Sequence, residues 1–274
     1  MTISTDSHNW QGIMEKVRRT ATARGRAASG YFSIEGTRLH ERALRAGISV
    51  EEAVVAEQYG RDLDARKQRL LAGLFDSGCR LTVVPDDVVY EFVGGRGLGA
   101  ILGLIKLPTA PSLTEIIAVQ KENQARFLVV VDVVDPGNVG ALVRTAHAGG
   151  AAGFVVVGAS DPFHPKALRT TMGSLFKLPI LRYTAVTSLL LDLKQNNVCC
   201  VGTAVAGAML LNQLPPITVP TAIFMGSEAW GLGNELLAEM DFRVTIPMVS
   251  GVDSYSVNAA AAIMLYELQR RQLK

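Results

Sequence analysis

The sequence is poor in several features that would settle its class at once. It has three cysteines, Cys79, Cys199 and Cys200, with no CxxC pair among its 274 residues. This excludes a disulfide-stapled miniprotein and argues against a structural zinc site, so no metal is expected. Apolar residues make up 49% of the chain and charged residues 19%, which excludes a disordered chain. The length suits one large domain or two modest ones.

The chain has little net positive charge, because 25 Asp and Glu nearly balance 27 Lys and Arg and leave a formal net charge of +2. This excludes a polybasic, histone-like binder but leaves room for a nucleic-acid enzyme with a local basic patch. The basic residues of one short segment stand without any acid among them: Lys16, Arg18, Arg19, Arg24 and Arg26. Such a run is typical either of a solvated helix face or of phosphate contact.

Charge is missing altogether between residues 195 and 227, a stretch that superficially suggests a membrane span. Pro215, Pro216 and Pro220 interrupt it, so no window offers the roughly 20 unbroken apolar residues that a spanning helix needs. The stretch is predicted to form two buried strands and their connections, with no membrane partner. Residues 1–10 contain no apolar signal region, so a cytoplasmic protein is expected.

Residues 1–106 are predicted to form a small α/β domain. Helices are expected over 10–28, 37–46 and 61–77, and strands over 32–36, 50–57 and 80–85. The glycine-rich residues 94–99 are expected to form a flexible turn. Two prolines in the segment 106–112 mark the boundary to a second domain.

The glycine cluster also contains a G-x-G-x-x-A spacing, formed by Gly95, Gly97 and Ala100. A dinucleotide-binding fingerprint of this kind opens a long helix and is followed by an acid about 20 residues later. The segment that follows here is strand-like and ends in proline. A nicotinamide oxidoreductase is an alternative that rests on this spacing alone.

Residues 107–274 are predicted to form a parallel α/β domain, because short apolar runs bounded by turn signals are typical of fully buried parallel strands. Strands are expected over 126–134, 154–158, 179–183, 198–205, 222–226 and 242–248, and helices over 141–150 and 254–271.

Two segments that follow predicted strands carry unusual polar residues. In residues 135–150, Asn138 stands at the start of a helix, where it is either a cap or a functional group. Arg144 lies on the same apolar helix, where a buried guanidinium needs partners. In residues 224–235, Glu228 stands among glycines that allow close approach to a ligand, and its charge there must be paired or bound.

A third such segment covers residues 246–263. Ser254, Ser256 and Asn258 cluster at the start of the last helix, and helix capping explains only one of them. Ligands of parallel α/β folds bind beyond the carboxyl ends of the strands. The second segment, which follows a predicted strand, fits this rule.

In order and spacing, the three segments resemble the signature motifs of the SpoU-type (TrmH-type) RNA ribose 2′-O-methyltransferases of the SPOUT superfamily. The matching positions are Asn138, Gly140 and Arg144 in the first motif, Gly226, Glu228 and Gly231 in the second, and Ile246, Pro247, Met248 and Ser254 in the third. The resemblance covers residues 127–270. Residues 29–106 resemble, more weakly, the ribosomal-protein-like RNA-binding domain that often precedes this domain.

The third motif departs from the family pattern. The family's S-L-N-V-S is Ser254-Tyr255-Ser256-Val257-Asn258 here, so serine holds the asparagine position and asparagine holds the second serine position. The exchange leaves open an alternative in which the protein keeps RNA and donor binding but has lost catalysis.

The resemblance implies a C-terminal α/β domain with a trefoil knot, one of the rare knotted folds. It also implies S-adenosylmethionine as cofactor and a homodimer whose interface completes the site. By position, the donor would be bound by Thr203, Gly226, Ile246, Met248, Tyr255, Ser256, Val257 and Asn258.

The resemblance further implies catalytic roles for four residues. Arg144 would grip the phosphate beside the target or stabilise the developing alkoxide, because a guanidinium cannot readily act as a base. Asn138 would orient Arg144 or the ribose. Glu228 would bind the target nucleotide or fix its loop, and Ser254 would contact the substrate side.

RNA selection is assigned to residues 1–106, with Arg24, Arg26 and Arg38 as candidates for phosphate contact. The ribosomal-protein-like domain favours ribosomal RNA as the partner. Transfer RNA remains open as the substrate, and so does methylation of a base by a member of the same knotted superfamily.

Overall fold

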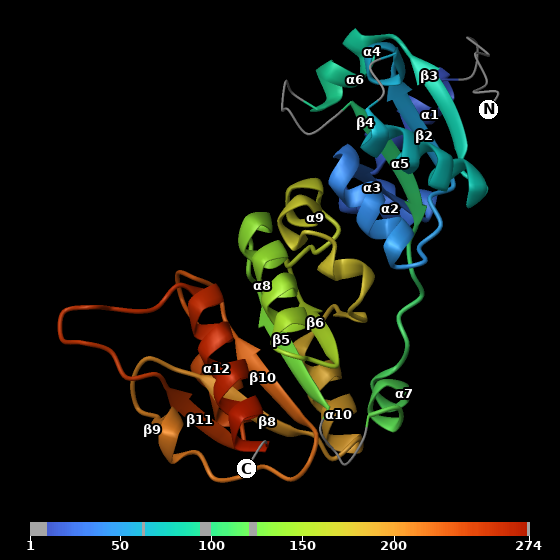
Figure 1. Ribbon diagram of the computed structural model, residues 1–274. Helices are drawn as coiled ribbons and strands as arrows, with labels where there is room; N and C mark the ends of the chain where they lie inside the picture. The colour runs from blue at the N-terminus through green and yellow to red at the C-terminus, as the bar shows by residue number, and fades with distance from the viewer. Residues whose placement is uncertain (1–9, 62–63, 94–99, 121–124, 273–274) are drawn as a thin grey trace. The chain divides into compact units, whose positions relative to one another are not determined.

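The computed structural model describes residues 10–61, 64–93, 100–120 and 125–272. The chain forms two compact units (Figure 1). The first consists of Met1–Thr109 and Phe163–Phe176, and the second of Ala110–Pro162 and Lys177–Lys274. The chain thus leaves the first unit within the proline-containing segment and later contributes one further segment to it.

The first unit is built on a mixed four-stranded sheet in the order β1-β4-β2-β3. Its strands are β1 (Tyr31–Glu35), β2 (Glu52–Ala56), β3 (Arg80–Val84) and β4 (Ile101–Lys106). β4 pairs antiparallel with β1 and with β2, whereas β2 and β3 are parallel. Its helices are α1 (Trp10–Arg19), α2 (Ala23–Ser29), α3 (Gly36–Arg45), α4 (Glu57–Arg61), α5 (Ala65–Asp76), α6 (Asp86–Val93), α9 (Pro165–Thr171) and the 3₁₀ turn η1 (Ser174–Phe176).

The helix predicted over residues 10–28 is in fact two helices, α1 and α2. The Thr22 hydroxyl caps α2 by accepting a hydrogen bond from the Gly25 amide at 3.0 Å. A Cβ atom at Gly25 would lie 1.9 Å from the carbonyl oxygen of Arg19. Thr22 itself has an extended backbone, with φ −112° and ψ 150°, so a single continuous helix is excluded.

Helix α5 starts four residues later than the predicted helix 61–77. The Asp64 carboxylate caps it and accepts hydrogen bonds from the amides of Arg66 and Lys67. Helices α4 and α6, short elements on either side of it in sequence, were not predicted. The glycine-rich residues 94–99 lie outside the described residues. The strand β4, not a helix, follows them, which is contrary to a dinucleotide fingerprint.

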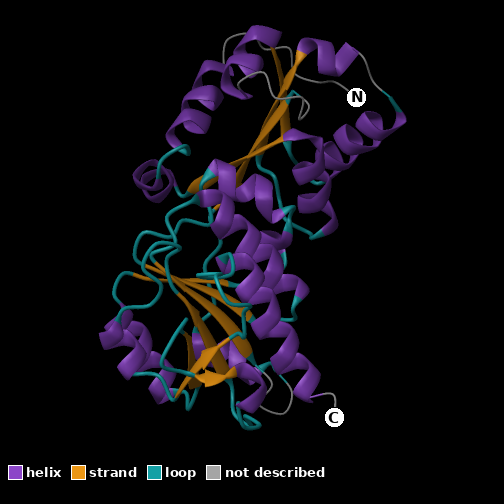
Figure 2. Cartoon of the chain, turned by 90° about the vertical axis from the view of Figure 1, so that its left-hand side faces the viewer, coloured by secondary structure: helices purple, strands orange, loops and turns teal. Residues whose placement is uncertain are grey.

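The second unit contains a seven-stranded sheet in the order β7-β6-β5-β10-β8-β11-β9, and all its pairs are parallel. Figure 2 shows the strands in orange and the helices beside them in purple. The strands are β5 (Arg126–Val131), β6 (Gly153–Val157), β7 (Ile180–Tyr183), β8 (Cys199–Thr203), β9 (Met209–Leu210), β10 (Thr221–Met225) and β11 (Phe242–Thr245). The helical elements are α7 (Leu113–Ala118), α8 (Pro136–Ala148), α10 (Val186–Gln195), η2 (Leu211–Gln213), α11 (Asn234–Ala238) and α12 (Val257–Gln272).

Helices cover the sheet of the second unit. Phe127, Val129 and Phe224 from the strands share a buried cluster with Leu113 of α7 and Leu189 of α10. Helices α8 and α12 pack on each other and on the central strands. A Cβ atom at Gly149, just after α8, would lie 2.9 Å from the Leu265 Cβ atom of α12. This close packing fixes the two helices that carry the first and third motifs.

The uncharged stretch 195–227 forms β8, β9, η2 and β10. Two of these strands, β8 and β10, are neighbours in the sheet and buried over most of their length. Within the described residues, no helix is long and apolar enough to cross a membrane.

His40 of α3 is fully buried in the first unit. Its Nδ1 atom donates to the carbonyl oxygen of Gly36 at 2.8 Å, and its Nε2 atom has no hydrogen-bond partner in the described structure. A Cβ atom at Gly103 would lie 2.5 Å from Nε2, so β4 leaves no space beside the ring. Burial lowers the pKa of His40 to about 4.

The folded protein therefore holds His40 neutral, and acid should destabilise it. The unfolded histidine takes up a proton near pH 6.5, whereas the folded one does so only near pH 4. Stability from this site is present above pH 6.5 and is lost as the pH falls toward 4. We expect the free energy of unfolding to drop by about 2 kcal/mol between pH 7 and pH 5, measured by urea unfolding.

The matched control is His40→Asn, whose amide keeps a donor near the Nδ1 position and does not titrate. The readout is the slope of stability against pH and not the absolute stability, which also falls when the ring is removed. Equal slopes for the original protein and His40→Asn between pH 7 and pH 5 would contradict the assignment of the acid sensitivity to His40.

Candidate active site

A cavity of about 570 Å³ lies at the carboxyl edge of the parallel sheet in the second unit. It is formed by the segments that follow β8, β10 and β11, together with the start of α12. Its size is within the range of small-molecule and cofactor sites. Its lining includes all but two of the predicted donor-binding residues: Thr203, Gly226, Ile246, Met248, Tyr255 and Val257, beside Glu228 and Ser254.

Gly226 makes a close turn possible at the end of β10. A Cβ atom there would lie 2.0 Å from the carbonyl carbon of Gly231 and 2.4 Å from the amide nitrogen of Leu232. The amide of Gly231 also donates to the carbonyl oxygen of Ser227 at 2.9 Å. The loop therefore folds back on the strand end, and only glycine fits at residue 226.

Thr203 connects two walls of the cavity. Its hydroxyl donates to the carbonyl oxygen of Phe224 at 2.9 Å, across the end of β8 to β10. The hydroxyl is therefore already occupied by the protein, and the backbone around it is held in place for a ligand.

The charged residues that line the cavity, Glu228 and Asp253, are both acidic. No Lys or Arg is among the described lining residues. The lining thus favours a ligand that carries positive charge.

Asn138 and Glu228 join the first and second motifs. Capping of α8 is carried by Asp135, whose carboxylate accepts from the backbone amide of Asn138 at 3.0 Å. The interpretation of Asn138 as the cap is therefore wrong. Its side-chain amide instead donates to the Glu228 carboxylate at 2.5 Å, across 90 positions of sequence.

Arg144 is exposed on α8, whereas the apolar helix suggested a buried guanidinium held by partners. Within the part of the chain that the structure describes, its side chain has no hydrogen bond or ion pair. The guanidinium is therefore available to a ligand.

The exchanged residues of the third motif lie outside the cavity lining. Ser256 caps α12 and accepts a hydrogen bond from the Ala259 amide at 3.3 Å. Asn258 turns toward α8, where its side-chain oxygen accepts from the Thr145 hydroxyl at 2.7 Å. Thr145 is the neighbour of Arg144, so Asn258 connects the arginine-bearing helix to the helix that forms part of the cavity.

The Thr145–Asn258 hydrogen bond should stabilise the contact between α8 and α12. We expect Thr145→Val to lower the free energy of unfolding by about 1 kcal/mol, because the part-buried Asn258 loses its donor. A double-mutant cycle with Asn258→Ala should give a coupling energy of about 0.5–1.5 kcal/mol in urea unfolding.

Thr145→Ser is the control for that cycle, since it keeps the hydroxyl and loses only a methyl group. A coupling energy indistinguishable from zero would show that the hydrogen bond does not hold the two helices together.

Among the cavity residues that were not predicted as site residues, Trp230 and Asp253 have side chains suited to binding a ligand. Trp230 lies inside the second motif and is 88% exposed, which is unusual for so large an apolar side chain. Asp253 stands just before the third motif. The sequence contained a signal for Trp230 as a site residue, because it is one of only two tryptophans and lies between the motif glycines Gly226 and Gly231.

The three candidate RNA contacts of the first unit differ in exposure. Arg24 and Arg38 are exposed, whereas Arg26 is only 2% exposed. One guanidinium nitrogen of Arg26 donates to the carbonyl oxygen of Thr20 at 2.7 Å, at the end of α1. Arg26 therefore stabilises the α1–α2 corner, and we remove it from the predicted phosphate contacts.

A parallel sheet with a ligand-sized cavity at its carboxyl edge, lined by the second and third motif segments and joined to the first by the Asn138–Glu228 hydrogen bond, defines an α/β enzyme. Residues 125–266 match the model of the SpoU rRNA Methylase family. The chain belongs to this family, whose fold implies the trefoil knot in the second unit.

Several relatives are similar over nearly the whole chain. A protein of Bacillus subtilis (strain 168), named 23S rRNA (guanosine(2553)-2′-O)-methyltransferase RlmP, is 28% identical over 95% of this chain and 94% of its own. A solved structure described as an RNA 2′-O ribose methyltransferase is 31% identical, with a TM-score of 0.77 over 97% of this chain and 98% of its own. The AdoMet-bound rRNA methyltransferase of Sinorhizobium meliloti is 26% identical, with a TM-score of 0.80 over 96% and 95%.

Proposed function

We propose that this protein transfers a methyl group from S-adenosylmethionine to one ribose 2′-hydroxyl of large-subunit ribosomal RNA. As a member of the SpoU rRNA methylase family, it is an RNA 2′-O-methyltransferase. The single observation that carries the proposal is the cavity at the sheet edge, where the second and third motifs meet and the Asn138–Glu228 pair brings in the first. Several relatives are named as methyltransferases of 23S rRNA.

The cavity fits the proposed donor in size and charge. S-adenosylmethionine supplies a methyl group activated by a positively charged sulfonium. The acidic Glu228 and Asp253 favour this charge, and the glycine-containing turn at Gly226 exposes backbone groups to a ligand. Thr203, Ile246, Met248, Tyr255 and Val257 would form the remaining contacts.

The chain's own residues would align the ribose and stabilise charge as the oxygen–carbon bond forms. Asn138 holds the Glu228 carboxylate in one position, from which it can bind the target nucleotide. Arg144 would bind the phosphate beside the target ribose or stabilise the developing alkoxide. Ser254 is exposed and lines the cavity, so it can contact the substrate. Alignment of this kind is worth up to about 7–11 kcal/mol of the barrier.

RNA selection would belong to the first unit, as a substrate-binding domain of residues 1–106 ahead of a methyltransferase domain of residues 107–274. Arg24 and Arg38 are exposed there and can contact phosphates. Structured RNA is recognised through shape, backbone and 2′-hydroxyl groups, so a net charge of only +2 is no obstacle.

A homodimer would complete the site. Large apolar side chains are exposed on the motif segments and on α12, as expected of an interface: Trp230, Val249, Val252, Tyr255 and Tyr266. A ribosomal RNA substrate makes the cytoplasm the compartment of the proposed reaction.

The test is to map 2′-O-methyl groups on ribosomal RNA with and without this protein. We expect one ribose to lose its methyl group when the protein is absent and to regain it when purified protein and S-adenosylmethionine are added. Nuclease digestion and mass spectrometry distinguish a methylated ribose from a methylated base. Methylation of transfer RNA only, or donor binding without methyl transfer to any RNA, would overturn the proposal.

A further inference from the structure

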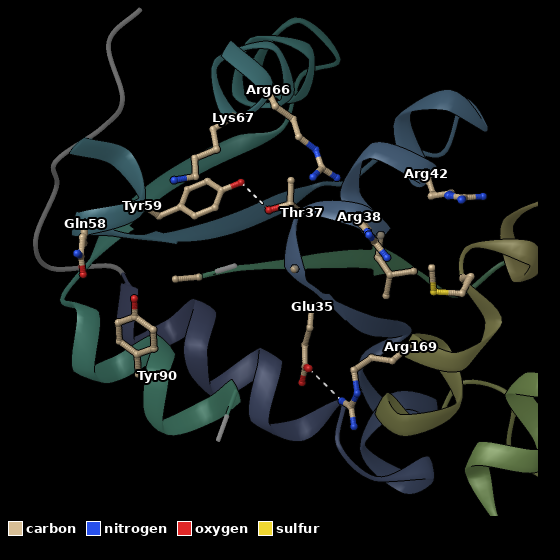
Figure 3. A pocket seen from close by; sticks show the side chains of 14 residues that line it. Glu35, Thr37, Arg38, Arg42, Gln58, Tyr59, Arg66, Lys67, Tyr90 and Arg169 are labelled. Carbon is tan, nitrogen blue, oxygen red and sulfur yellow. Dashed lines mark hydrogen bonds and ion pairs between the residues drawn. The ribbon is translucent and has the colours of Figure 1, made fainter. Parts of the chain in front are cut away.

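A second large cavity, of about 650 Å³, lies within the first unit (Figure 3). It opens between the end of β1, helices α3 to α6 and the segment around α9. The methyl-transfer mechanism uses none of its residues except Arg38. Its lining consists largely of charged, polar and aromatic side chains, among them Arg38, Arg42, Arg66, Lys67, Arg169, Glu35, Thr37, Gln58, Tyr59 and Tyr90.

This cavity is strongly positive. Its lining holds five cationic side chains and one carboxylate, a formal charge of +4, whereas the whole chain carries only +2. Positive charge is therefore concentrated here beyond the chain's average. A concave, basic surface of this kind attracts anions.

Two of the cations are fixed by acids and shape the walls. Arg66 forms two hydrogen bonds to the Glu41 carboxylate, at 2.7 and 2.8 Å, and these lower the pKa of Glu41. Arg169 donates to the buried Glu35 carboxylate at 3.0 Å (Figure 3). These pairs hold the walls in position.

Arg38 and Arg42 are different, because both are exposed and neither side chain has a hydrogen bond or ion pair among the described residues. They stand four positions apart on α3, and both residues line the cavity (Figure 3). Like charges at this spacing repel each other and destabilise a helix. An anion bound between them would remove this repulsion.

The stem of Arg42 is also held in place. A Cβ atom at Gly173 would lie 2.7 Å from the Arg42 Cβ atom, and Gly173 has a φ of 84°. Only glycine allows the chain to pass so close in this backbone conformation. The aliphatic stem of Arg42 is therefore packed against the chain at Gly173, and its exposed guanidinium lies beyond this contact.

Two tyrosines add aromatic surface to the cavity. Tyr90 of α6 is 43% exposed, so its ring is open to a ligand. Tyr59 is buried, its hydroxyl hydrogen-bonds to that of Thr37 at 2.9 Å, and Lys67 lies over its ring (Figure 3). Tyr59 is thus part of the wall, and Tyr90 is the ring available for stacking.

The cavity thus offers two cations on one side and an exposed aromatic ring on another, which are the groups that bind the phosphates and stack on the bases of single-stranded RNA (Figure 3). We propose that this cavity binds a short unpaired segment of the RNA substrate, with one phosphate between Arg38 and Arg42 and one base on Tyr90. The volume exceeds what an inorganic anion needs and suits a ligand of nucleotide size. The proposal rests on the proposed function for the identity of the RNA, but its test does not require methyl transfer.

The first part of the test measures binding of large-subunit ribosomal RNA at several salt concentrations by filter binding. Arg38→Gln/Arg42→Gln should weaken binding and reduce the slope of log affinity against log salt by about 0.7 for a single-stranded phosphate contact. Arg45→Gln is the matched control, because Arg45 is exposed on the same helix but lies outside the cavity lining. Equal changes in the double variant and the control would overturn the proposal.

The second part tests the aromatic contact. Tyr90→Leu should weaken RNA binding about 5- to 150-fold, the range of one base–aromatic stack, whereas Tyr90→Phe should retain it. Circular dichroism checks that each variant is folded, and Arg38→Gln alone replaces the double variant if that one is not. Unchanged binding by Tyr90→Leu would overturn the stacking contact.

The third part separates RNA from free nucleotide and this proposal from the proposed function. Adenosine and guanosine monophosphate are titrated alone, and binding as tight as that of RNA would assign the cavity to a free nucleotide. Donor binding, measured by calorimetry, should be unchanged in all variants, because the donor cavity lies in the second unit. RNA binding that depends on Arg38, Arg42 and Tyr90 without any methyl transfer would contradict the proposed function and support the nucleotide site.

Discussion

Arg144→Ala is expected to lower methyl transfer to ribosomal RNA by about 10²–10³-fold, the usual cost of removing one electrostatic group from a transition state. The guanidinium is exposed beside the motif segments and has no hydrogen bond or ion pair within the described structure. Its removal should therefore change the free energy of unfolding by no more than about 0.5 kcal/mol relative to the unmodified protein. The measurement is tritiated methyl transfer, with donor affinity followed by calorimetry.

The kinetic constants distinguish the two roles open to Arg144. A guanidinium that stabilises the developing alkoxide acts only in the transition state, so its removal lowers kcat. If the guanidinium holds the neighbouring phosphate equally in the ground state and the transition state, its removal mainly raises KM for RNA and reduces the salt dependence of RNA binding. Lys194→Ala, which removes an exposed cation from α10 of the same unit, is the matched control. Near-original methylation by Arg144→Ala, with donor binding unchanged, would show that Arg144 is not catalytic.

The donor-binding residues were predicted by position from the resemblance to the family motifs, and the fold supplies a physical reason for those that fit. Each motif stands directly after an apolar strand, and parallel strands end at one edge of a sheet. Six of the eight predicted donor residues line the cavity for this reason. Ser256 and Asn258 do not, because the direction of a side chain at a helix start depends on what packs beside it. Here Ser256 turns to the Ala259 amide as the helix cap, and Asn258 turns to the Thr145 hydroxyl.

Contacts across long stretches of sequence could not be predicted in the same way. The Asn138–Glu228 pair depends on β5 and β10 being neighbours, although they are separated by several other elements in the chain. Nothing near either residue encodes that pairing. The membership of Phe163–Phe176 in the first unit is likewise a tertiary property.

The burial of Arg26 shows a further limit of sequence patterns. A run of basic residues looks the same whether a given member points to solvent or into a helix corner. The turn at Thr22 redirects the chain, and Arg26 then meets the carbonyl oxygen of Thr20, whereas Arg24 stays exposed. A periodic pattern interpreted as one helix over 10–28 could not separate the two arginines.

The second large effect is expected from Gly226→Ala, which should abolish donor binding. The new methyl group would lie about 2 Å from backbone atoms of Gly231, and backbone cannot rotate away as a side chain can. The loop must open, the hydrogen bond from the Gly231 amide to Ser227 is lost, and the wall of the cavity moves. We expect at least 100-fold weaker binding of S-adenosylmethionine by calorimetry, with a loss of about 1–3 kcal/mol in stability from overpacking.

The same loop contains its own controls. At Gly233 nothing lies within 4 Å of an added Cβ atom and φ is −62°, so Gly233→Ala should bind the donor almost normally. At Gly231 nothing lies within 4 Å of an added Cβ atom either, but φ is 64°, so Gly231→Ala tests backbone strain without a steric clash. This variant replaces Gly226→Ala if Gly226→Ala does not fold. We expect donor affinity to be highest for Gly233→Ala, lower for Gly231→Ala and lowest for Gly226→Ala. If all three bind alike, the fold-back of this loop does not shape the donor site, and the placement of S-adenosylmethionine in this cavity is wrong.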